Sequence, residues 1–207
     1  MIYMTKPFLF GTIILALSSC AQISYNQAIP LLRTAIIGAK DINVDSEFLE
    51  ARKFSFVKIN LGRSAVAIMP LASIGNDGSY KWVNSTGEVI YTLNGKIIKT
   101  VGIVYDMELF NYDDFDLNFS SDTLDARYEM QLHNPKGFIT QSAKISFKAQ
   151  PKSKNTYLAM ESIQSQGFRW NYKNSYLVNS ENNLVLETEQ HIHPKYPPVK
   201  LEFYYKF

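Results

Sequence analysis

From about residue 54 onward, the chain alternates apolar and polar positions with the period of two that is typical of half-buried β-strands. Runs rich in β-branched and aromatic residues recur roughly every 8 to 14 residues, and turn-forming residues separate them. This spacing predicts a mainly β fold, an antiparallel meander that forms a closed or partly open barrel or sandwich. The predicted strands are residues 54–61, 64–69, 80–83, 88–93, 96–103, 126–133, 138–150, 156–165, 168–178, 184–193 and 199–207.

One turn in this pattern is specified by an Asn-Gly pair. Asn94 and Gly95 separate the apolar runs 88–93 and 96–103. A type I′ turn requires positive φ at both central residues, and Asn followed by Gly adopts that conformation at little cost. We therefore predict a tight β-hairpin at this position.

The start of the chain follows a different pattern. Lys6 precedes the apolar, uncharged run 8–17, and the sequence becomes polar from Ser18 onward. As a helix, ten apolar residues would rise about 15 Å, which is roughly half the thickness of a bilayer core. The run therefore predicts a secretory signal peptide and not a transmembrane helix.

The only cysteine of the chain follows this run directly. Residues 17–20 read Leu-Ser-Ser-Cys, which resembles the bacterial lipobox, where small residues precede a cysteine that becomes acylated. Several acyl chains on Cys20 would anchor the protein stably to a membrane. Ala21 stands where an aspartate is linked to inner-membrane retention, so the resemblance favours an outer-membrane destination.

These motifs divide the chain into three parts. Residues 1–19 are predicted to be a lipoprotein signal peptide, residues 20–26 a lipidated tether, and residues 27–207 a single β-rich periplasmic domain. That domain is predicted to begin with one helix, because Pro30 suits a first helical turn and Gly38 is a stop signal.

The charge balance of the chain bears on its partners. With 21 Lys and Arg against 19 Asp and Glu, the formal net charge is +2 at pH 7. A near-neutral protein has no electrostatic footprint for nucleic acid, so we predict no nucleic-acid partner. With Cys20 acylated no disulfide can form, and the fold must be held by packing alone.

Two histidines are the best candidates for metal ligands. His191 and His193 are two residues apart, so on a strand both side chains would point to one face. Only His133 remains as a third histidine, and Pro194 ends the strand just there. We therefore expect a solvated strand end, with no metal site and no other cofactor.

Seven carboxylates between residues 106 and 125 form an acidic segment without Lys or Arg. Their spacing does not match an EF-hand loop, and Phe115, Leu117 and Phe119 alternate through the segment. We expect a solvated loop or edge strand here, not a calcium site or a pair of glycosidase carboxylates. Because the sequence also lacks the Gly-x-Ser-x-Gly, Walker and dinucleotide-binding motifs, we predict that the protein has no catalytic residues and is not an enzyme.

Aromatic side chains offer one way to bind a glycan, since their faces can stack on sugar rings. The candidates for such contacts are Tyr80, Trp82, Trp170 and Tyr172. Core positions or cross-strand pairs are the alternative interpretation for most of them. A carbohydrate-binding lipoprotein therefore remains an alternative function.

The end of the chain supports a further alternative. Residues 201–207 alternate aromatic side chains and end on Phe207, which resembles the closing strand of small integral outer-membrane β-barrels. Two observations argue against this hypothesis. Lys58 and Asn60 share a strand face with Phe56, so that face is not uniformly apolar, and a lipobox is unusual on a membrane-spanning barrel.

One stretch carries a family resemblance. Residues 80–103 contain Trp82, a short polar turn, an apolar strand, an Asn-Gly-Lys turn and a Lys-Thr pair. This order resembles the YjbF/GfcB-type lipoproteins of group 4 capsule and exopolysaccharide loci. Residues 176–190 resemble a second signature of that family, with Asn179 where Asp is usual.

The resemblance implies a periplasm-facing, β-barrel-like domain on an outer-membrane lipid anchor. It also implies a non-enzymatic role in the assembly or export of a surface polysaccharide. The implied partners are the membrane, polysaccharide-export proteins and, in the alternative function, the polysaccharide itself. The family has no established catalytic residues that could be assigned to positions of this chain. Trp82, Asn94 and Gly95 match the family motif, and we interpret them as determinants of the fold.

Overall fold

The computed structural model describes residues 42–62, 66–112, 123–153, 155–167 and 169–207. The chain divides into the units Met1–Ala39 and Lys40–Phe207, and every described residue belongs to the second unit. The predicted signal peptide, the tether with Cys20 and the predicted N-terminal helix therefore lie outside the described residues.

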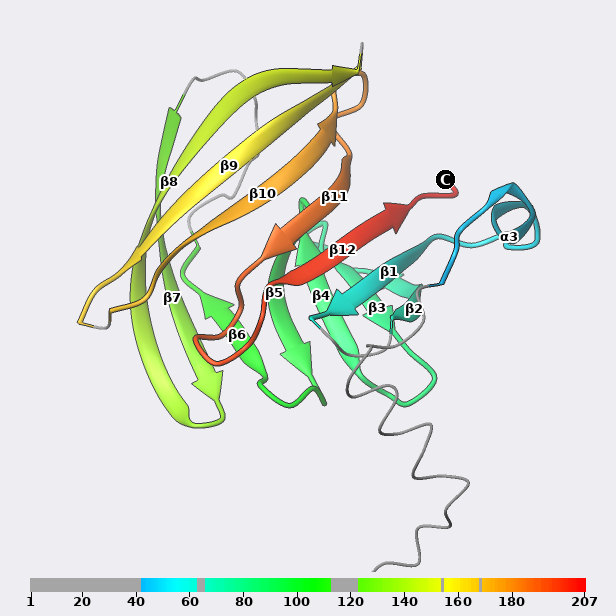
Figure 1. Cartoon of the computed structure of the whole chain (residues 1–207). Helices are drawn as coiled ribbons and strands as arrows, with labels where there is room; N and C mark the ends of the chain where they lie inside the picture. Colours follow the sequence, from blue (N-terminus) through cyan, green and yellow to red (C-terminus); the bar gives the residue numbers. More distant parts are fainter. Residues whose placement is uncertain (1–41, 63–65, 113–122, 154, 168) are drawn as a thin grey trace, which may run out of the picture. The chain divides into compact units, whose positions relative to one another are not determined.

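Within the described part of the chain, twelve antiparallel strands form one closed barrel (Figure 1). Every strand pairs with its neighbours in chain order, and β1 closes the barrel by pairing with β12. The predicted antiparallel meander is confirmed, and of the predicted alternatives the closed barrel is the one that forms. The strands are β1 Phe56–Leu61, β2 Ala67–Ile74, β3 Tyr80–Val83, β4 Val89–Leu93, β5 Lys96–Val101, β6 Met107–Phe110, β7 Thr123–His133, β8 Lys136–Ser153, β9 Thr156–Ser165, β10 Asn171–Asn179, β11 Val185–Gln190 and β12 Val199–Tyr204.

The period of two in the sequence corresponds to the inside and the outside of the barrel. Along β4, Ile90 and Thr92 are buried, and Val89, Tyr91 and Leu93 are half-buried. Along β10, Asn174, Tyr176 and Val178 are buried in the same alternating way. The inward side chains pack into one hydrophobic cluster that fills the barrel.

A short helix, α3 (Ser46–Glu50), precedes β1, and the sequence pattern did not predict it. The carboxylate of Asp45 caps this helix by accepting a hydrogen bond from the Phe48 N–H at 2.9 Å. The Phe48 ring meets the Phe56 ring edge-on, with centroids 5.7 Å apart. This contact joins the helix to the start of β1.

The acidic segment departs from its prediction. Its residues Met107–Phe110 form β6, which pairs on both sides in the closed barrel and is neither a loop nor an edge strand. The charge of Glu108 suggested solvent, whereas its side chain binds Lys99 of the neighbouring strand at 2.8 Å. The residues on either side of Glu108 are buried. Residues 113–122 of the segment lie outside the described residues.

The predicted Asn-Gly hairpin joins β4 to β5. Asn94 has a φ of 47° and Gly95 a φ of 77°, the left-handed values that a type I′ turn requires. Leu93 and Lys96 are the paired residues that flank the turn. The hairpin prediction is therefore confirmed.

The tip of this hairpin touches the opposite wall of the barrel. β5 and β11 have five strands between them in either direction, yet Gly95 packs against Val185 of β11. A Cβ atom on Gly95 would lie only 2.6 Å from Cγ1 of Val185, so this approach requires glycine. The β5–β11 contact therefore narrows the barrel across its middle.

A side chain of β11 takes the place of a missing strand beside β5. In the described ladder, β5 pairs with β6 only at Lys99 and Glu108, so the backbone at Gly95 and Ile97 lacks a strand partner on that side. Oε1 of Gln190 accepts a hydrogen bond from the Ile97 N–H at 3.0 Å, and Nε2 donates one to the Gly95 carbonyl at 2.7 Å. Buried backbone groups need such partners, which explains why the two strands approach each other.

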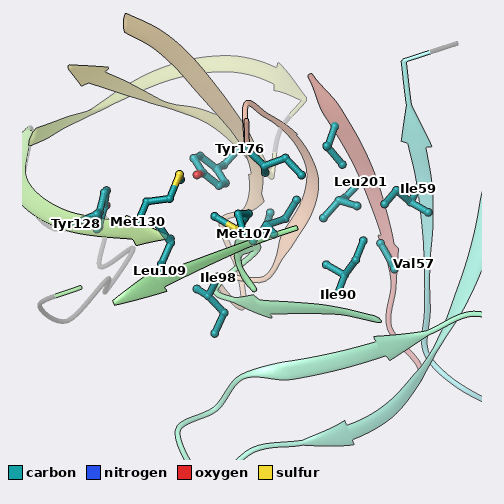
Figure 2. Packing of buried hydrophobic residues seen from close by; sticks show 14 of the residues in the cluster. Val57, Ile59, Ile90, Ile98, Met107, Leu109, Tyr128, Met130, Tyr176 and Leu201 are labelled. Atoms are coloured by element: carbon teal, nitrogen blue, oxygen red, sulfur yellow. The ribbon is translucent and has the colours of Figure 1, made fainter. Parts of the chain in front are cut away.

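The β5–β11 contact lies between two parts of the barrel interior, although the buried apolar side chains form one continuous cluster. We call the space enclosed by β6–β10 the polar half, and the space enclosed by β12 and β1–β4 the apolar half. In Figure 2, Tyr128 and Met130 lie on one side of the cluster, and Val57 and Ile59 lie on the other. The candidate sites described next belong to one half or the other.

Candidate functional site

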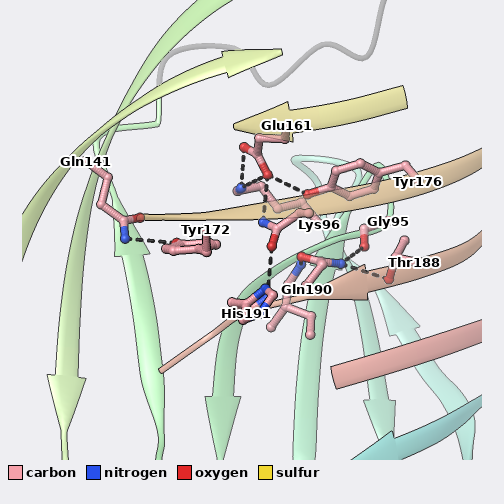
Figure 3. Close-up of polar contacts among 11 residues, drawn as sticks. Gly95, Lys96, Gln141, Glu161, Tyr172, Tyr176, Thr188, Gln190 and His191 are labelled. Atoms are coloured by element: carbon pink, nitrogen blue, oxygen red, sulfur yellow. Dashed lines mark hydrogen bonds and ion pairs between the residues drawn. The ribbon is translucent and has the colours of Figure 1, made fainter. Parts of the chain in front are cut away.

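The polar half encloses a buried ion pair. Nζ of Lys96, the first residue of β5, lies 2.7 Å from Oε1 and 2.9 Å from Oε2 of Glu161 on β9. Only 5% of the Lys96 side chain and 0% of the Glu161 side chain are exposed. Figure 3 shows Lys96 and Glu161 next to Tyr176 of β10. Because both charges lose their hydration at this depth, further hydrogen bonds must complete the pair.

Three more side chains surround the ion pair. Oε2 of Glu161 accepts hydrogen bonds from Nδ2 of Asn174 and from the hydroxyl of Tyr176, both at 2.8 Å. The ammonium of Lys96 lies 4.3 Å from the ring centre of Tyr128, which places it in cation–π contact. Fixed protein partners thus replace water around both charges.

Burial and pairing shift the pKa values in this network. Burial alone would raise the pKa of Glu161, but the Lys96 ammonium and the hydrogen bonds from Asn174 and Tyr176 hold it below its ordinary value. For Lys96, burial prevails over the attraction of Glu161 and lowers the pKa. Burial, followed by the Glu161 charge, raises the pKa of Tyr176 well above its ordinary value, so this phenol stays a hydrogen-bond donor.

The polar contacts continue from the ion pair to the rim of the polar half. Oδ1 of Asn174 accepts a hydrogen bond from the His191 N–H at 2.9 Å, which ties the end of β11 to β10. The rings of Tyr172 and His191 lie 5.4 Å apart, and the Tyr172 hydroxyl accepts a hydrogen bond from Nε2 of Gln141 at 2.9 Å. The network therefore fixes the mutual positions of β5 and of β8–β11, because each polar group needs its particular partner.

The four aromatic residues predicted to contact a glycan lie as two separate pairs. Trp170 and Tyr172 stack at the start of β10, with ring centroids 4.3 Å apart and both residues half-buried. Tyr80 and Trp82 belong to β3, and their rings meet edge-on at 5.8 Å. One pair belongs to the polar half and the other to the apolar half, so the four residues do not form one surface.

Trp82 is fully buried in the apolar half. Its residue exposure is 0%, and Nε1 donates a hydrogen bond to Oγ1 of Thr92 at 2.9 Å. Its ring lies 5.7 Å from that of Phe203 on β12. Tyr80 contacts the rings of Tyr205 and Phe207 near the end of the chain. Trp82 thus fills the core, and a glycan would meet only the half-buried rings of the other three candidates.

The two histidines follow β11, and the prediction of a solvated strand end is wrong for His193. This residue is 1% exposed, and its ring stacks on that of Tyr105 with centroids 4.5 Å apart. Nδ1 of His193 accepts a hydrogen bond from the Lys195 N–H at 3.1 Å, and burial lowers the pKa of the imidazole. Across the described ranges, no three His, Cys, Asp or Glu side chains gather in a way that would hold a metal ion.

The apolar half opens into a pocket of about 500 Å³ at the end of the barrel where β1 and β3 finish. Ile59, Met69 and Ile90 are among its apolar lining residues. The turn from β3 to β4, with Asn84 and Glu88, supplies its polar side. The barrel therefore offers a closed polar network in one half and an open apolar pocket in the other.

Comparison with known proteins identifies the family of this chain. The sequence model of the family described as group 4 capsule polysaccharide lipoprotein GfcB, YjbF matches residues 30–204. The chain belongs to this family. The resemblance that the motif around Trp82 suggested is therefore confirmed.

The barrel of this capsule lipoprotein family member has a counterpart among solved structures. The crystal structure of the hypothetical lipoprotein YmcC from Escherichia coli K12 matches with a TM-score of 0.67 and 19% sequence identity, over 88% of this chain and 96% of YmcC. At that identity, the likeness shows a shared fold. A comparison with curated proteins gave no match. Among the described residues, no helix is both long enough and apolar enough to cross a membrane.

The sequence patterns missed three residues of the polar network and the β5–β11 contact, namely Lys96, Glu161 and Gln190. A lysine directly after an Asn-Gly turn normally reads as a solvated residue. A signal was present on β9, because Glu161 shares a strand face with Ala159 and Ile163, which are both buried. Gln190 gave no such signal, since its partners lie 93 and 95 residues away in the sequence.

Proposed function

We propose that this member of the capsule lipoprotein family is a lipid-anchored, non-enzymatic component of the assembly or export of a capsule polysaccharide or exopolysaccharide. The family match over residues 30–204 carries the proposal. The family is described by its link to group 4 capsule polysaccharide, and YmcC, which shares the fold, is described as a lipoprotein. The partners that we propose are polysaccharide-export proteins.

The anchor that we propose is acylated Cys20. The lipobox at residues 17–20 and the description of the family as lipoproteins support it. Ala21, which directly follows the cysteine, supports an outer-membrane destination. The periplasm-facing position that we propose follows from what the family resemblance implies. Several acyl chains on one cysteine would hold the barrel at the membrane surface.

The geometry of the polar half supports a non-enzymatic role. Lys96 and Glu161 have shifted pKa values, which is often a mark of catalytic groups. A general acid or base must come within hydrogen-bond reach of a substrate proton. Glu161 instead binds Lys96, Asn174 and Tyr176, and its side chain is 0% exposed. A substrate could reach this carboxylate only if the barrel opened.

The outer wall of the barrel supports a tethered protein over an integral membrane barrel. The ion pair between Lys99 and Glu108, whose side chains are 39% and 27% exposed, lies on strands of that wall. A membrane-spanning barrel presents an apolar band to lipid. The charges on the wall, together with Trp82 packed inside, fit a barrel that is surrounded by water.

Replacing Cys20 in the producing bacterium tests the proposal. In a strain deleted for the gene, we expect less polysaccharide at the cell surface, and the intact gene should restore it. Cys20→Ala should abolish incorporation of labelled palmitate and release the barrel from the membrane fraction, whereas the control Ser18→Ala keeps a working lipobox. Unchanged surface polysaccharide in the deleted strain would contradict the role, and palmitate on the Cys20→Ala protein would contradict the anchor.

A second candidate function is direct binding of the polysaccharide by Trp170 and Tyr172. Their tilted stack lies at the start of β10, next to a surface hollow lined by Arg169 and Asn171. We expect Trp170→Ala to weaken binding of the purified polysaccharide about tenfold in titration calorimetry. Tyr80→Ala, which removes the candidate ring on the other half of the barrel, is the control. Equal affinities of the two variants and the wild type would exclude this function.

A further inference from the structure

The pocket of the apolar half is lined mainly by hydrocarbon. Nine of its fourteen described lining residues carry apolar side chains without a ring. Ile59, Met69 and Ile90 are buried lining residues, and each is at most 2% exposed. The exposed Val104 extends the apolar lining to the mouth. A volume of about 500 Å³ and a lining of this kind are typical of sites that bind small molecules.

One side of the pocket mouth is polar and rigid. Oδ1 of Asn84 accepts hydrogen bonds from the N–H groups of Thr86 at 3.0 Å and Glu88 at 2.9 Å, which fixes the turn between β3 and β4. Nδ2 of Asn84 donates to Oε2 of Glu88, and the Thr86 hydroxyl lies 2.8 Å from Oδ1 of Asn84 and 3.3 Å from Oε2 of Glu88. The side chain of Glu88 is thus held in place at the mouth.

The charge at the mouth is negative. Glu88 is the only charged residue among the lining residues that the structure describes. Tyr196 lines the pocket as well, and its pKa is raised by burial and then by the charge of Glu88. A carboxylate in this position attracts cationic or hydrogen-bond-donating groups and repels anions.

We propose that this pocket binds the hydrocarbon chain of a single-chain amphiphile whose head group is uncharged or cationic. The apolar lining removes the chain from water, which is the main driving force for such a ligand. The amide, hydroxyl and carboxylate groups at the mouth bind the head group, and Glu88 discriminates against an anionic one. The ligand site does not depend on the role in polysaccharide export.

Trp82 provides a reporter inside the same half of the barrel. Its Cα pairs with that of Ile90 in the pocket, and the chain has two tryptophans, so Trp170→Phe leaves Trp82 as the sole one. The full chain with Cys20→Ala and Trp170→Phe is titrated with ω-bromodecyl maltoside, ω-bromodecyltrimethylammonium and ω-bromodecanoate below their micellar concentrations. Quenching of Trp82 fluorescence by bromine then reports entry of the chain.

Two substitutions separate the contribution of the chain from that of the head group. Ala67→Phe places a ring in the pocket and should weaken binding of the maltoside about tenfold or more, whereas Ala72→Phe at an exposed position of the same strand should not. Glu88→Gln should strengthen binding of bromodecanoate about tenfold and weaken that of the trimethylammonium probe. Glu189→Gln, an exposed carboxylate outside the pocket, is the matched control.

Saturable quenching by the maltoside and the trimethylammonium probe, weaker quenching by bromodecanoate, and loss of binding in Ala67→Phe would support the site. Absence of saturable quenching by all three probes would overturn it, as would equal binding by Ala67→Phe and Ala72→Phe. Equal affinity for all three probes, unchanged by Glu88→Gln, would overturn the head-group assignment. Thermal unfolding checks each variant, and Ala67→Leu replaces Ala67→Phe if the larger ring prevents folding.

Discussion

The two halves of the barrel interior differ in the interactions that stabilise them. In the polar half, Glu161 occupies an inward position of β9 between Ala159 and Ile163, and it is tolerated there because Lys96 and two hydrogen-bond donors meet it. In the apolar half, side chains such as Trp82 fill space with one hydrogen bond at their edge. The polar half therefore depends on a few specific partners, and the apolar half depends on volume.

A single strand shows the same contrast between its two sides. Lys96 of β5 binds Glu161 at 2.7 Å inside the barrel, and Lys99 of β5 binds Glu108 at 2.8 Å on the outside. The exposed fractions of the side chains are 5% and 0% for the inner pair but 39% and 27% for the outer pair. Two ion pairs of nearly equal length should therefore differ widely in the cost of breaking them.

The largest effect is expected from breaking the inner pair. Glu161→Ala leaves the Lys96 ammonium buried without its carboxylate, and we expect the free energy of unfolding to fall by about 3–5 kcal/mol in urea denaturation. Adding Lys96→Met should recover part of this loss, because no uncompensated charge then remains. A double variant no more stable than Glu161→Ala would contradict this account.

The β5–β11 contact between the two halves should be the next most sensitive element. Gln190→Ala leaves the Ile97 N–H and the Gly95 carbonyl without their partner, and we expect a loss of about 2 kcal/mol in the free energy of unfolding. Gln164→Ala removes an exposed amide on β9 and should change stability by less than about 0.5 kcal/mol. If the two substitutions lower the free energy of unfolding equally, the Gln190 side chain does not stabilise the β5–β11 contact.

Lowering the pH should weaken the stability that the polar half contributes and leave the contribution of the apolar half unchanged. Because the pKa of Glu161 is held below its ordinary value of 4.5, the contribution of the pair is complete above pH 4.5 and is lost as the pH falls through the folded-state pKa. The wild type and Leu201→Ala, which alters the apolar half, should therefore lose stability in parallel below pH 4.5. Glu161→Gln should lose less over the same range in urea titrations. If the free energy of unfolding fell in parallel with pH for all three proteins, Glu161 would not be the cause of the loss in acid.

The smallest effect is expected on the outside of β5. Glu108→Ala breaks the pair with Lys99, and we expect a loss of at most about 1 kcal/mol, because water solvates both groups. Added salt should reduce the difference from the wild type further. A loss as large as that of Glu161→Ala would show that burial does not separate the two pairs.

The local part of the fold could be predicted from the sequence. The predicted strands 80–83 and 156–165 have the bounds of β3 and β9, and the hairpin at Asn94 and Gly95 forms as expected. Alternation and turn chemistry are local signals, so single-chain patterns reveal them. β6 was missed because its four residues are too few to establish a period within an acidic segment.

The candidate site depends on contacts that local patterns do not contain. Lys96 is buried only because the hairpin tip reaches across to β11, and Gln190 finds its partners over 90 residues away. His193 is buried because Tyr105, from a distant loop, stacks on it. The family could be recognised from the motif that includes Trp82, whereas acylation of Cys20 stays a prediction.

The amide of Ile97 tests the β5–β11 contact most directly. Ile97 pairs with Thr92 of β4 on one side, and its N–H donates to Oε1 of Gln190 at 3.0 Å on the side where the described ladder gives it no partner on β6. Native-state hydrogen exchange should show a slowly exchanging Ile97 amide in the wild type and a rapidly exchanging one in Gln190→Ala, while the amides of β9 remain slow in both. Rapid exchange of the Ile97 amide in the wild type would contradict the cross-barrel contact, and with it the division of the interior into two halves.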